Sequence, residues 1–384
     1  MFINNFQLSK AKPLKILLIS LQGMGDLLFA LPLIRQLKKN LPQSRIYVLT
    51  FKKNKAILID EVEIEKIIGF GEAAGLNFLR RLKVIRQLRR LKFDLSICTY
   101  PSGLRSAIIP FLIGAKLRCA HEYTYLKSWP FLFNLKIKVP WLKHIVELNL
   151  DIISRLGLSG QKNNIDLSLT ISEKDKQKVY DLSVQHKILS NDFLIGFHPA
   201  TSLSRLGKCW PLSNFMQLAK KLIDDYKAKI LLFGAKEEVK VVEPFTLMSQ
   251  AAVIDFTGLL TIKQTYALIK RCHLFISNDS ALAHLAAAAG VPTVALFGPT
   301  DPRLYSPFGE RNLIIRQQLP CSPCAYGVCG YIECVADREG FSKNSFVCKQ
   351  GDFACMKQIE PQIVFNRIVD LINRLHLSPG TRSK

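Results

Sequence analysis

The sequence predicts an α/β protein made of two consecutive units, each with a parallel sheet covered by helices on both faces. Short apolar runs alternate with amphipathic stretches whose apolar residues recur at helical spacing, which is the pattern of a parallel sheet. This pattern stops in a polar region at 159–192 and then starts again. A length of 384 residues, 48% of them apolar, suits two domains of ordinary size better than one.

The first unit opens with an expected strand at 16–19, a glycine turn at 22–25 and a helix that begins near Asp26 and ends before Pro42. A strongly basic helix is expected at 76–91. The further strands expected in this unit are 46–50, 64–69 and 95–99.

The second unit repeats the same order of elements. The expected strands are 193–197, 229–233, 253–255, 274–277 and 293–297, and the expected helices are 211–226, 262–272 and 281–289. A last amphipathic helix at 361–375 is expected to cross back onto the first unit. The predicted boundaries are therefore 1–185 for the first domain, 186–360 for the second, and 361–384 for the crossing helix and the tail.

The formal net charge of +23 is concentrated in the first part of the chain, where residues 1–150 hold 25 Lys and Arg against 9 Asp and Glu. Such a surface attracts nucleic acid, an anionic membrane or a phosphorylated substrate, or is merely solvated. The longest apolar stretches, around 106–115 and 282–298, are interrupted and fall short of the roughly 20 residues of a spanning helix. The first apolar run contains Lys15 and is too short for a signal peptide, so we expect a cytoplasmic protein.

The turn at 22–25 ends directly before Asp26, the only acidic residue in the first fifty positions. It matches neither the dinucleotide-binding GxGxxG pattern nor a Walker loop, and no acidic residue follows the second expected strand to bind a ribose. A nicotinamide-dependent oxidoreductase is therefore disfavoured. Two hypotheses remain for Asp26: an aspartate that stabilises the first turn of the helix, or a general base in a substrate site.

Two loops of the second unit follow expected strands and suit an anion. The first contains His198 and, shortly after, Ser204 and Lys208, whose hydroxyl and ammonium groups suit a phosphate, although a loop lysine is commonly only solvated. The second, 278–281, opens a helix whose first N–H groups can bind an anion or are simply capped. His284 either faces the same site or packs against the sheet. Removing Lys208 is expected to weaken the binding of such an anion and barely to affect folding.

Six of the ten cysteines lie in the segment 321–355, and Cys321 and Cys324 form a CxxC pair. The other four are scattered through apolar or mixed segments, as reduced thiols are in cytosolic proteins. No second CxxC follows, and the spacings match neither zinc ribbons nor ferredoxins. A metal site and a packed loop of reduced cysteines both remain open.

Gly25-Asp26-Leu27 followed by Pro32 forms a short N-terminal signature. Four further segments follow it in a fixed order: 198–210, 232–238, 277–301 and 355–359. Together they resemble the motifs of glycosyltransferase family 9, the heptosyltransferases of lipopolysaccharide synthesis. The resemblance extends from about residue 14 to 370, and the segment 277–301 is specific in both length and order.

The resemblance implies a GT-B architecture, in which two Rossmann-like domains with parallel sheets face a cleft. It implies an inverting transfer that uses no metal and no cofactor, with Asp26 as the catalytic base. A family glutamate near the ribose of the donor falls on Glu237 or Glu238, and Ala281 stands where glycine is frequent. The residues expected to bind the donor are Ser204, Lys208, Glu237, Glu238, Asp279, Ser280, Ala281 and His284.

The expected reaction is transfer of a sugar, heptose from ADP-heptose, to a phosphorylated glycolipid acceptor at the inner membrane surface, by a monomer. The basic helix offers Arg80, Arg86 and Arg90 to the phosphates of such an acceptor. The alternatives are another GT-B enzyme with a different nucleotide sugar, a catalytically silent GT-B module, and a nucleic-acid-binding protein. The last is disfavoured because only aliphatic residues and a glutamine separate the cations of this helix, whereas base stacking needs aromatic ones.

Overall fold

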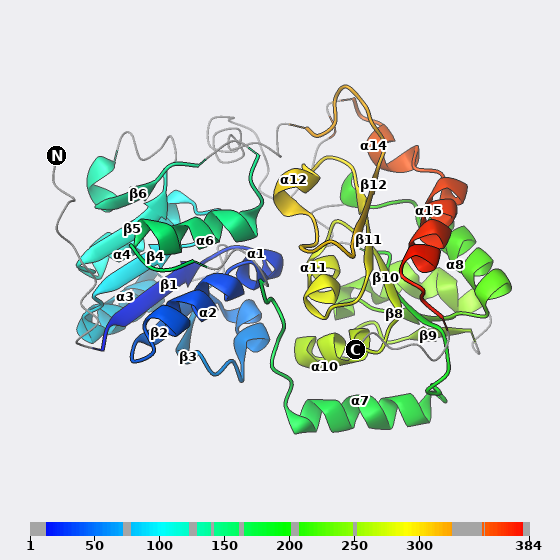
Figure 1. Ribbon diagram of the computed structural model, residues 1–384, viewed down its shortest axis with the longest axis horizontal. Helices are drawn as coiled ribbons and strands as arrows, with labels where there is room; N and C mark the ends of the chain where they lie inside the picture. Colours follow the sequence, from blue (N-terminus) through cyan, green and yellow to red (C-terminus); the bar gives the residue numbers. More distant parts are fainter. Residues whose placement is uncertain are drawn as a thin grey trace. The chain divides into compact units, whose positions relative to one another are not determined.

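The computed structural model describes residues 13–71, 78–122, 129–139, 142–160, 165–200, 207–248, 252–324, 348 and 350–378. The chain divides into two compact units, Met1–Thr170 and Ile171–Lys384. Each unit contains one six-stranded parallel sheet with helices on both faces (Figure 1). The α/β class predicted from the sequence is confirmed.

The sheet of the first unit has the strand order β3-β2-β1-β4-β5-β6. Its strands are β1 (Lys15–Ser20), β2 (Arg45–Phe51), β3 (Ile64–Phe70), β4 (Leu95–Cys98), β5 (Leu117–His121) and β6 (Leu135–Ile137). Its helices are α1 (Met24–Leu28), α2 (Leu31–Asn40), α3 (Phe78–Leu91), α4 (Leu104–Leu112) and α6 (Ile145–Arg155), with 3₁₀ turns η1 (Lys52–Leu58) and η2 (Pro130–Leu132). Helix α2 packs beside α6, and α3 contacts α4.

The sheet of the second unit has the equivalent order, β12-β11-β10-β7-β8-β9. Its strands are β7 (Leu194–His198), β8 (Lys229–Leu232), β9 (Val253–Asp255), β10 (Leu274–Asn278), β11 (Thr293–Phe297) and β12 (Leu313–Arg316). Its longer helices are α7 (Glu173–Gln185), α8 (Leu212–Tyr226), α10 (Ile262–Ile269), α11 (Ala281–Ala288) and α15 (Pro361–Arg374). Its shorter elements are η4 (Lys236–Glu238), α9 (Val239–Val242), η5 (Glu243–Leu247), α12 (Pro302–Tyr305) and α14 (Ala354–Lys357).

The strand order reverses between β1 and β4 in the first unit and between β7 and β10 in the second. In open α/β sheets, ligands bind beyond the carboxyl ends of the strands at such a reversal. The loops that follow β1 and β4, and those that follow β7 and β10, are therefore the places to look for a site.

The central strands are mostly apolar and almost completely buried because helices cover both faces of each sheet. Strand β1 is buried from Ile16 onward, and all five residues of β10 and of β11 are buried. Within the described residues, none of the helices combines the length and the hydropathy that crossing a bilayer requires.

The boundary between the units differs from the predicted one, because α7 belongs to the second unit and not to the first. Gln264 of α10 donates to Asp175 of α7 at 3.0 Å, and Arg271 binds Ser183. The first unit ends earlier, where the backbone N–H of Thr170 donates to Glu61 at 2.9 Å. Most residues of α7 are polar, so the sequence shows no apolar stripe at helical spacing there, and this helix was not predicted.

The last helix, α15, packs within the second unit, which differs from the predicted crossing onto the first. Its buried residues Val364, Ile368 and Leu371 join the core cluster that includes the apolar face of α8. The indole N–H of Trp210 also donates to the carbonyl of Ile359, just before this helix, at 2.7 Å. An amphipathic pattern shows that a helix has a buried face but does not show which partner buries it.

Candidate active site

Asp26 lies in the first turn of α1, at the carboxyl end of β1. Its Oδ2 accepts the backbone N–H of Gly23 at 3.0 Å, which closes the turn, and the residue is half-buried. A Cβ atom at position 23 would lie 3.1 Å from the same carboxylate oxygen, so glycine gives the carboxylate room at this position. The helix-stabilising role of Asp26 is therefore present in the structure, and a half-buried carboxylate with a second oxygen can also accept a proton.

Two buried asparagines hold the loop and helix that carry Asp26. Asn54 donates to the carbonyl of Gln22 at 2.9 Å, and Asn149 of α6 donates to the carbonyl of Phe29 at 3.3 Å. The side chain of Asn149 also accepts the backbone N–H of Tyr100, which follows β4, at 2.8 Å. The two loops at the strand-order reversal of the first unit are thus fixed to one another through one side chain.

The basic residues of α3 form an exposed face on the first unit. Arg80, Lys83, Arg86 and Arg90 are all exposed, while Leu88 is buried on the opposite side. Among the described residues, these four cations have no carboxylate within ion-pair distance. Their charge is therefore available to an anionic partner.

In the second unit, His198 at the end of β7 is the centre of a buried hydrogen-bond network. Its Nε2 lies 3.2 Å from Glu238 Oε2, and its Nδ1 lies 2.9 Å from Ser280 Oγ. Ser277 Oγ lies 2.9 Å from Ser280 Oγ. An ionised carboxylate only accepts hydrogen bonds, so the histidine donates through Nε2. The network joins the loops after β7, β8 and β10 at one edge of the sheet.

The geometry separates the two candidate glutamates. Glu238 is buried in this network and also accepts the backbone N–H of Ala235 at 2.8 Å, whereas Glu237 is exposed. Burial opposes the ionisation of Glu238, but the hydrogen bond and charge of His198 and the N–H of Ala235 outweigh it and lower its pKa. Glu238 is therefore an ionised acceptor held in place beside the sheet edge.

A second buried cluster lies beside this network and contains Lys208, Asp279 and Thr300. Lys208 Nζ and Thr300 Oγ1 both donate to Asp279 Oδ2, at 2.5 Å and 2.6 Å. Lys208 and Asp279 are each only 6% exposed. Burial opposes the ionisation of Asp279, but the charges of Lys208 and His284 and the two hydrogen bonds lower its pKa below the usual value. The pair is therefore charged.

The loop that leads to Lys208 is fixed by Asn278, a fully buried residue at the end of β10. Its amide N donates to the carbonyl of Pro199 at 2.9 Å, and its amide O accepts the backbone N–H of Trp210 at 2.9 Å. Ser204, predicted to bind the donor, lies outside the described residues.

The start of α11 lies between the two clusters. Ser280 precedes the helix and turns its hydroxyl toward His198 and Ser277, so within the described chain it does not cap the N–H groups of the helix. Ala281 is the first residue of α11, and His284, one turn later, is buried close enough to Asp279 to influence its pKa. The helix N-terminus therefore remains suited to an anionic ligand.

The sequence analysis assigned no contact to three residues of this site, although Asn278 lies in the loop 278–281 and Ser277 and Thr300 lie in the segment 277–301. Thr300 binds Asp279, Ser277 binds the Ser280 hydroxyl, and Asn278 fixes the loop at its two ends. All three follow or end a buried strand at the same sheet edge, which is the signal that would have indicated them.

Four of the six cysteines in the segment 321–355 lie within the described residues, and three of them are near Cys355. Cys329 and Cys334 fall outside the described residues, and the other four are free thiols. Burial first, and then the nearby thiols of Cys324, Cys348 and Cys321, raise the pKa of Cys355 to about 11. Within the described residues, no three histidine, cysteine or acidic side chains are placed to share a metal ion.

With this geometry in view, comparison with known proteins decides the family. The family profile described as "Glycosyltransferase family 9 (heptosyltransferase)" matches residues 81–332, which is more than half of the chain. The chain belongs to glycosyltransferase family 9. It is a glycosyltransferase with the GT-B fold, as its sequence motifs predicted.

The family 9 enzyme is similar to lipopolysaccharide heptosyltransferase 2 of Escherichia coli, with 27% identity over 79% of this chain and 88% of that protein. Among solved structures, a glycosyltransferase of family 9 from Veillonella parvula matches with a TM-score of 0.77 and 22% identity, covering 94% of this chain and 97% of that one. The ADP-heptose lipopolysaccharide heptosyltransferase II of E. coli matches with a TM-score of 0.70 and 23% identity, covering 95% of this chain and all of that one. At these identities, the structural matches establish the fold.

Proposed function

We propose that this family 9 enzyme transfers a heptosyl group from ADP-heptose to a phosphorylated glycolipid acceptor in lipopolysaccharide core synthesis. The observation that carries the proposal is the buried Lys208–Asp279 pair beside the start of α11, where a cation and helix N–H groups can bind a diphosphate. The names of the curated relatives support heptose as the transferred sugar. A solved relative with a TM-score of 0.67 and 18% identity was determined with ADP, which supports the nucleotide.

The mechanism is a single displacement. Ionised Asp26 accepts the proton of the acceptor hydroxyl as this oxygen forms a bond to the anomeric carbon of the sugar. The bond from that carbon to the diphosphate breaks, the configuration inverts, and ADP leaves with the electron pair. Lys208 and the first N–H groups of α11 stabilise the charge on the departing phosphate, and Asp279 positions Lys208.

Glu238 and His198 serve a different part of the donor. The ionised carboxylate of Glu238 can accept hydrogen bonds from the ribose hydroxyls. His198, at the end of β7, fixes the orientation of this carboxylate through a hydrogen bond. The exposed Glu237 is expected to be replaceable without loss of activity. The transfer is expected to need no metal and no cofactor, so its rate should be the same in excess EDTA.

The donor can be identified by a thermal-shift screen of ADP-, UDP- and GDP-sugars. A ligand at about a hundred times its dissociation constant should add about 2.7 kcal/mol of stability. We expect ADP-heptose to raise the melting temperature most, and ADP alone to account for a large part of the shift. A larger shift with a UDP- or GDP-sugar would favour the alternative, another nucleotide sugar on the same fold.

The acceptor is proposed to bind through the exposed cations of α3, at the inner surface of the membrane, with the enzyme acting as a monomer. Changing Arg86 and Arg90 to Gln should raise the apparent KM for a natural glycolipid acceptor and reduce its dependence on salt. Each cation near an anionic surface contributes about 1 kcal/mol of binding free energy. Added salt that shortens the Debye length below about 8 Å screens this attraction. The KM for the donor should stay the same.

The matched control removes the same charge from the second unit, by changing the exposed residues Arg367 and Arg374 to Gln. This variant should leave the acceptor KM unchanged. Equal effects of the two double variants would show that the basic face is a solubilising surface. Tight binding of random oligonucleotides at physiological salt would instead favour the nucleic-acid alternative.

A further inference from the structure

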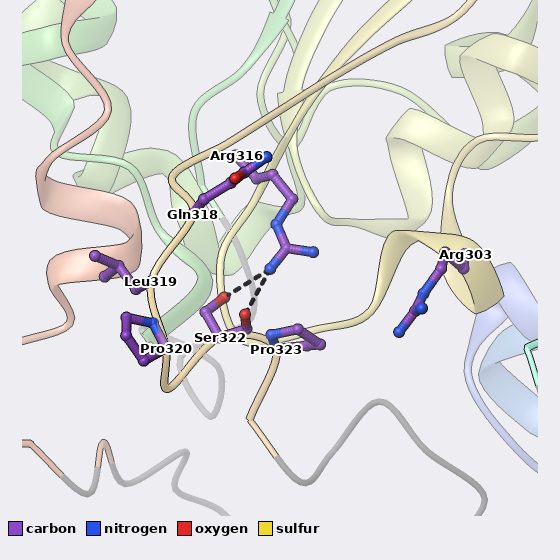
Figure 2. A pocket seen from close by; sticks show the side chains of 7 residues that line it. All are labelled: Arg303, Arg316, Gln318, Leu319, Pro320, Ser322 and Pro323. Atoms are coloured by element: carbon purple, nitrogen blue, oxygen red, sulfur yellow. Dashed lines mark hydrogen bonds between the residues drawn. The ribbon is translucent and has the colours of Figure 1, made fainter.

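A hollow of about 600 Å³ lies on the second unit, between α12 and the segment that follows β12. Figure 2 shows the guanidinium of Arg316 beside Ser322 on one side of it and the side chain of Arg303 on the other. Gln318 and Pro323 also line the hollow. The hollow is separate from the buried clusters around His198 and Asp279.

Arg316 has hydrogen-bonding capacity to spare. Its Nη2 donates to the carbonyl oxygen of Ser322 at 2.7 Å and lies 3.3 Å from the hydroxyl of the same residue. Its Nε is shielded from solvent and has no hydrogen-bond partner among the described residues. Guanidinium groups carry five N–H donors, so the two at Nη1, which have no partner among the described residues, remain available to a ligand.

Arg303 is held rigidly at the other side of the hollow. Its Nη2 lies 2.6 Å and its Nε 3.0 Å from the carboxylate of Asp301, which is completely buried. Burial opposes the ionisation of Asp301, but the hydrogen bonds and charge of Arg303 and the charge of Arg316 lower its pKa. The arginine is therefore fixed in place before any ligand arrives, while half of its side chain stays exposed.

The charge of the hollow is positive. Among the described residues that line it, two are arginines and none is acidic. The carboxylate of Asp301 neutralises the guanidinium of Arg303. The lining therefore carries a net charge of one positive unit. The hydroxyl of Ser322 donates to the carbonyl of Gly298 at 2.6 Å, so the donors that face the hollow are two guanidinium groups and the amide of Gln318. Such a set matches the donors that bind a tetrahedral or planar oxyanion.

We propose that this hollow, lined by Arg303, Arg316, Gln318 and Ser322, binds an oxyanionic group of the acceptor, a phosphate or a carboxylate. The assignment to the acceptor rests on the proposed function, which already places the donor diphosphate at Lys208 and α11. Two consecutive residues connect the hollow to the Lys208–Asp279 cluster. Thr300 donates to Asp279 at 2.6 Å, and the next residue, Asp301, binds Arg303. An anion in the hollow would thus bind next to the donor loop without competing with it.

The test measures binding of inorganic phosphate and of malonate to the full chain by calorimetry, at constant ionic strength, with and without saturating ADP. Arg303→Gln and Arg316→Gln are compared with Arg311→Gln, which changes an exposed arginine outside the hollow. We expect each of the first two variants to weaken anion binding about tenfold or more, since each loses a charge-assisted hydrogen bond. Arg311→Gln should bind as the parent does.

Phosphate binding that survives saturation with ADP supports the hollow as a separate site, and tighter binding of phosphate or of malonate shows which group it prefers. Equal affinity in the parent and both variants, or complete loss of phosphate binding in ADP, overturns the proposal. If Arg303→Gln or Arg316→Gln unfolds because Asp301 or Ser322 loses its partner, Arg303→Lys decides instead, since it keeps a cation beside Asp301 and loses the planar guanidinium that binds the anion. Absence of ADP binding would contradict the proposed donor and leave the result on the hollow intact.

Discussion

Replacing Asp26 with asparagine is expected to lower the turnover about 10²–10⁴-fold and to leave the fold as stable as before. The loss follows because an amide cannot accept the proton of the acceptor hydroxyl at neutral pH. Stability should persist because the amide oxygen of asparagine can accept the N–H of Gly23, as Asp26 Oδ2 does at 3.0 Å. Turnover and thermal unfolding of the two proteins, measured side by side, check both parts.

Asp26→Ala is the matching control, because alanine removes the proton acceptor and the partner of Gly23 together. This variant should lose activity and also lower the melting temperature. The KM for the donor should change little in either variant. If Asp26→Asn turned over at the rate of the parent, Asp26 would serve only to stabilise the start of α1.

Much of the fold could be predicted from the sequence because strands buried on both faces are short, apolar and followed by turn residues. Strands β9 and β11 have the predicted bounds, and α8, α10 and α11 differ from prediction only at their ends. Strands β5, β6 and β12 were not predicted, since each is short and contains a cation: Arg118, Lys136 and Arg316. Helix α7 was not predicted because its residues are mostly polar, with only Val179 and Ser183 buried.

The candidate site could be predicted as a set of loops but not as a set of contacts. Asp279 and Lys208 are 71 positions apart in the chain, and nothing in the sequence shows that they form a buried pair. The choice between Glu237 and Glu238 depended on which side chain the 3₁₀ turn directs toward His198. Parallel strands bring such residues to one sheet edge, and only the strand order shows which strands are neighbours.

The Lys208–Asp279 pair also changes what removing Lys208 should do. A loop lysine in water contributes little to folding, but Lys208 is buried and its ammonium is the partner of a buried carboxylate. Lys208→Met should therefore lower the free energy of unfolding by about 3–5 kcal/mol at pH 7, because Asp279 is left as an uncompensated buried charge. It should also weaken donor binding, through loss of the cation at the phosphate.

Asp279→Asn in the Lys208→Met background separates these two effects. The double variant has no buried charge left to compensate, so it should regain much of the lost stability, while donor binding stays weak. Lys220→Met is the control for a broken ion pair at the surface, since Lys220 and Asp224 are both largely exposed, and it should leave stability unchanged. Failure of the double variant to recover stability would show that Lys208 acts through packing and not through its charge.

The pH dependence of unfolding gives an independent check on the same pair. In the parent the pKa of Asp279 is lowered, so its ionised form contributes stability above the unfolded pKa of about 3.9. That contribution is lost as the pH falls through the folded pKa. In Lys208→Met the pKa of Asp279 should rise instead, because burial then acts without the lysine.

The stability deficit of this variant relative to the parent should therefore be largest at neutral pH and shrink as the pH falls toward 4. Urea unfolding of both proteins at pH 7 and pH 4.5 measures the deficit, and a deficit independent of pH would exclude an uncompensated Asp279 as its cause.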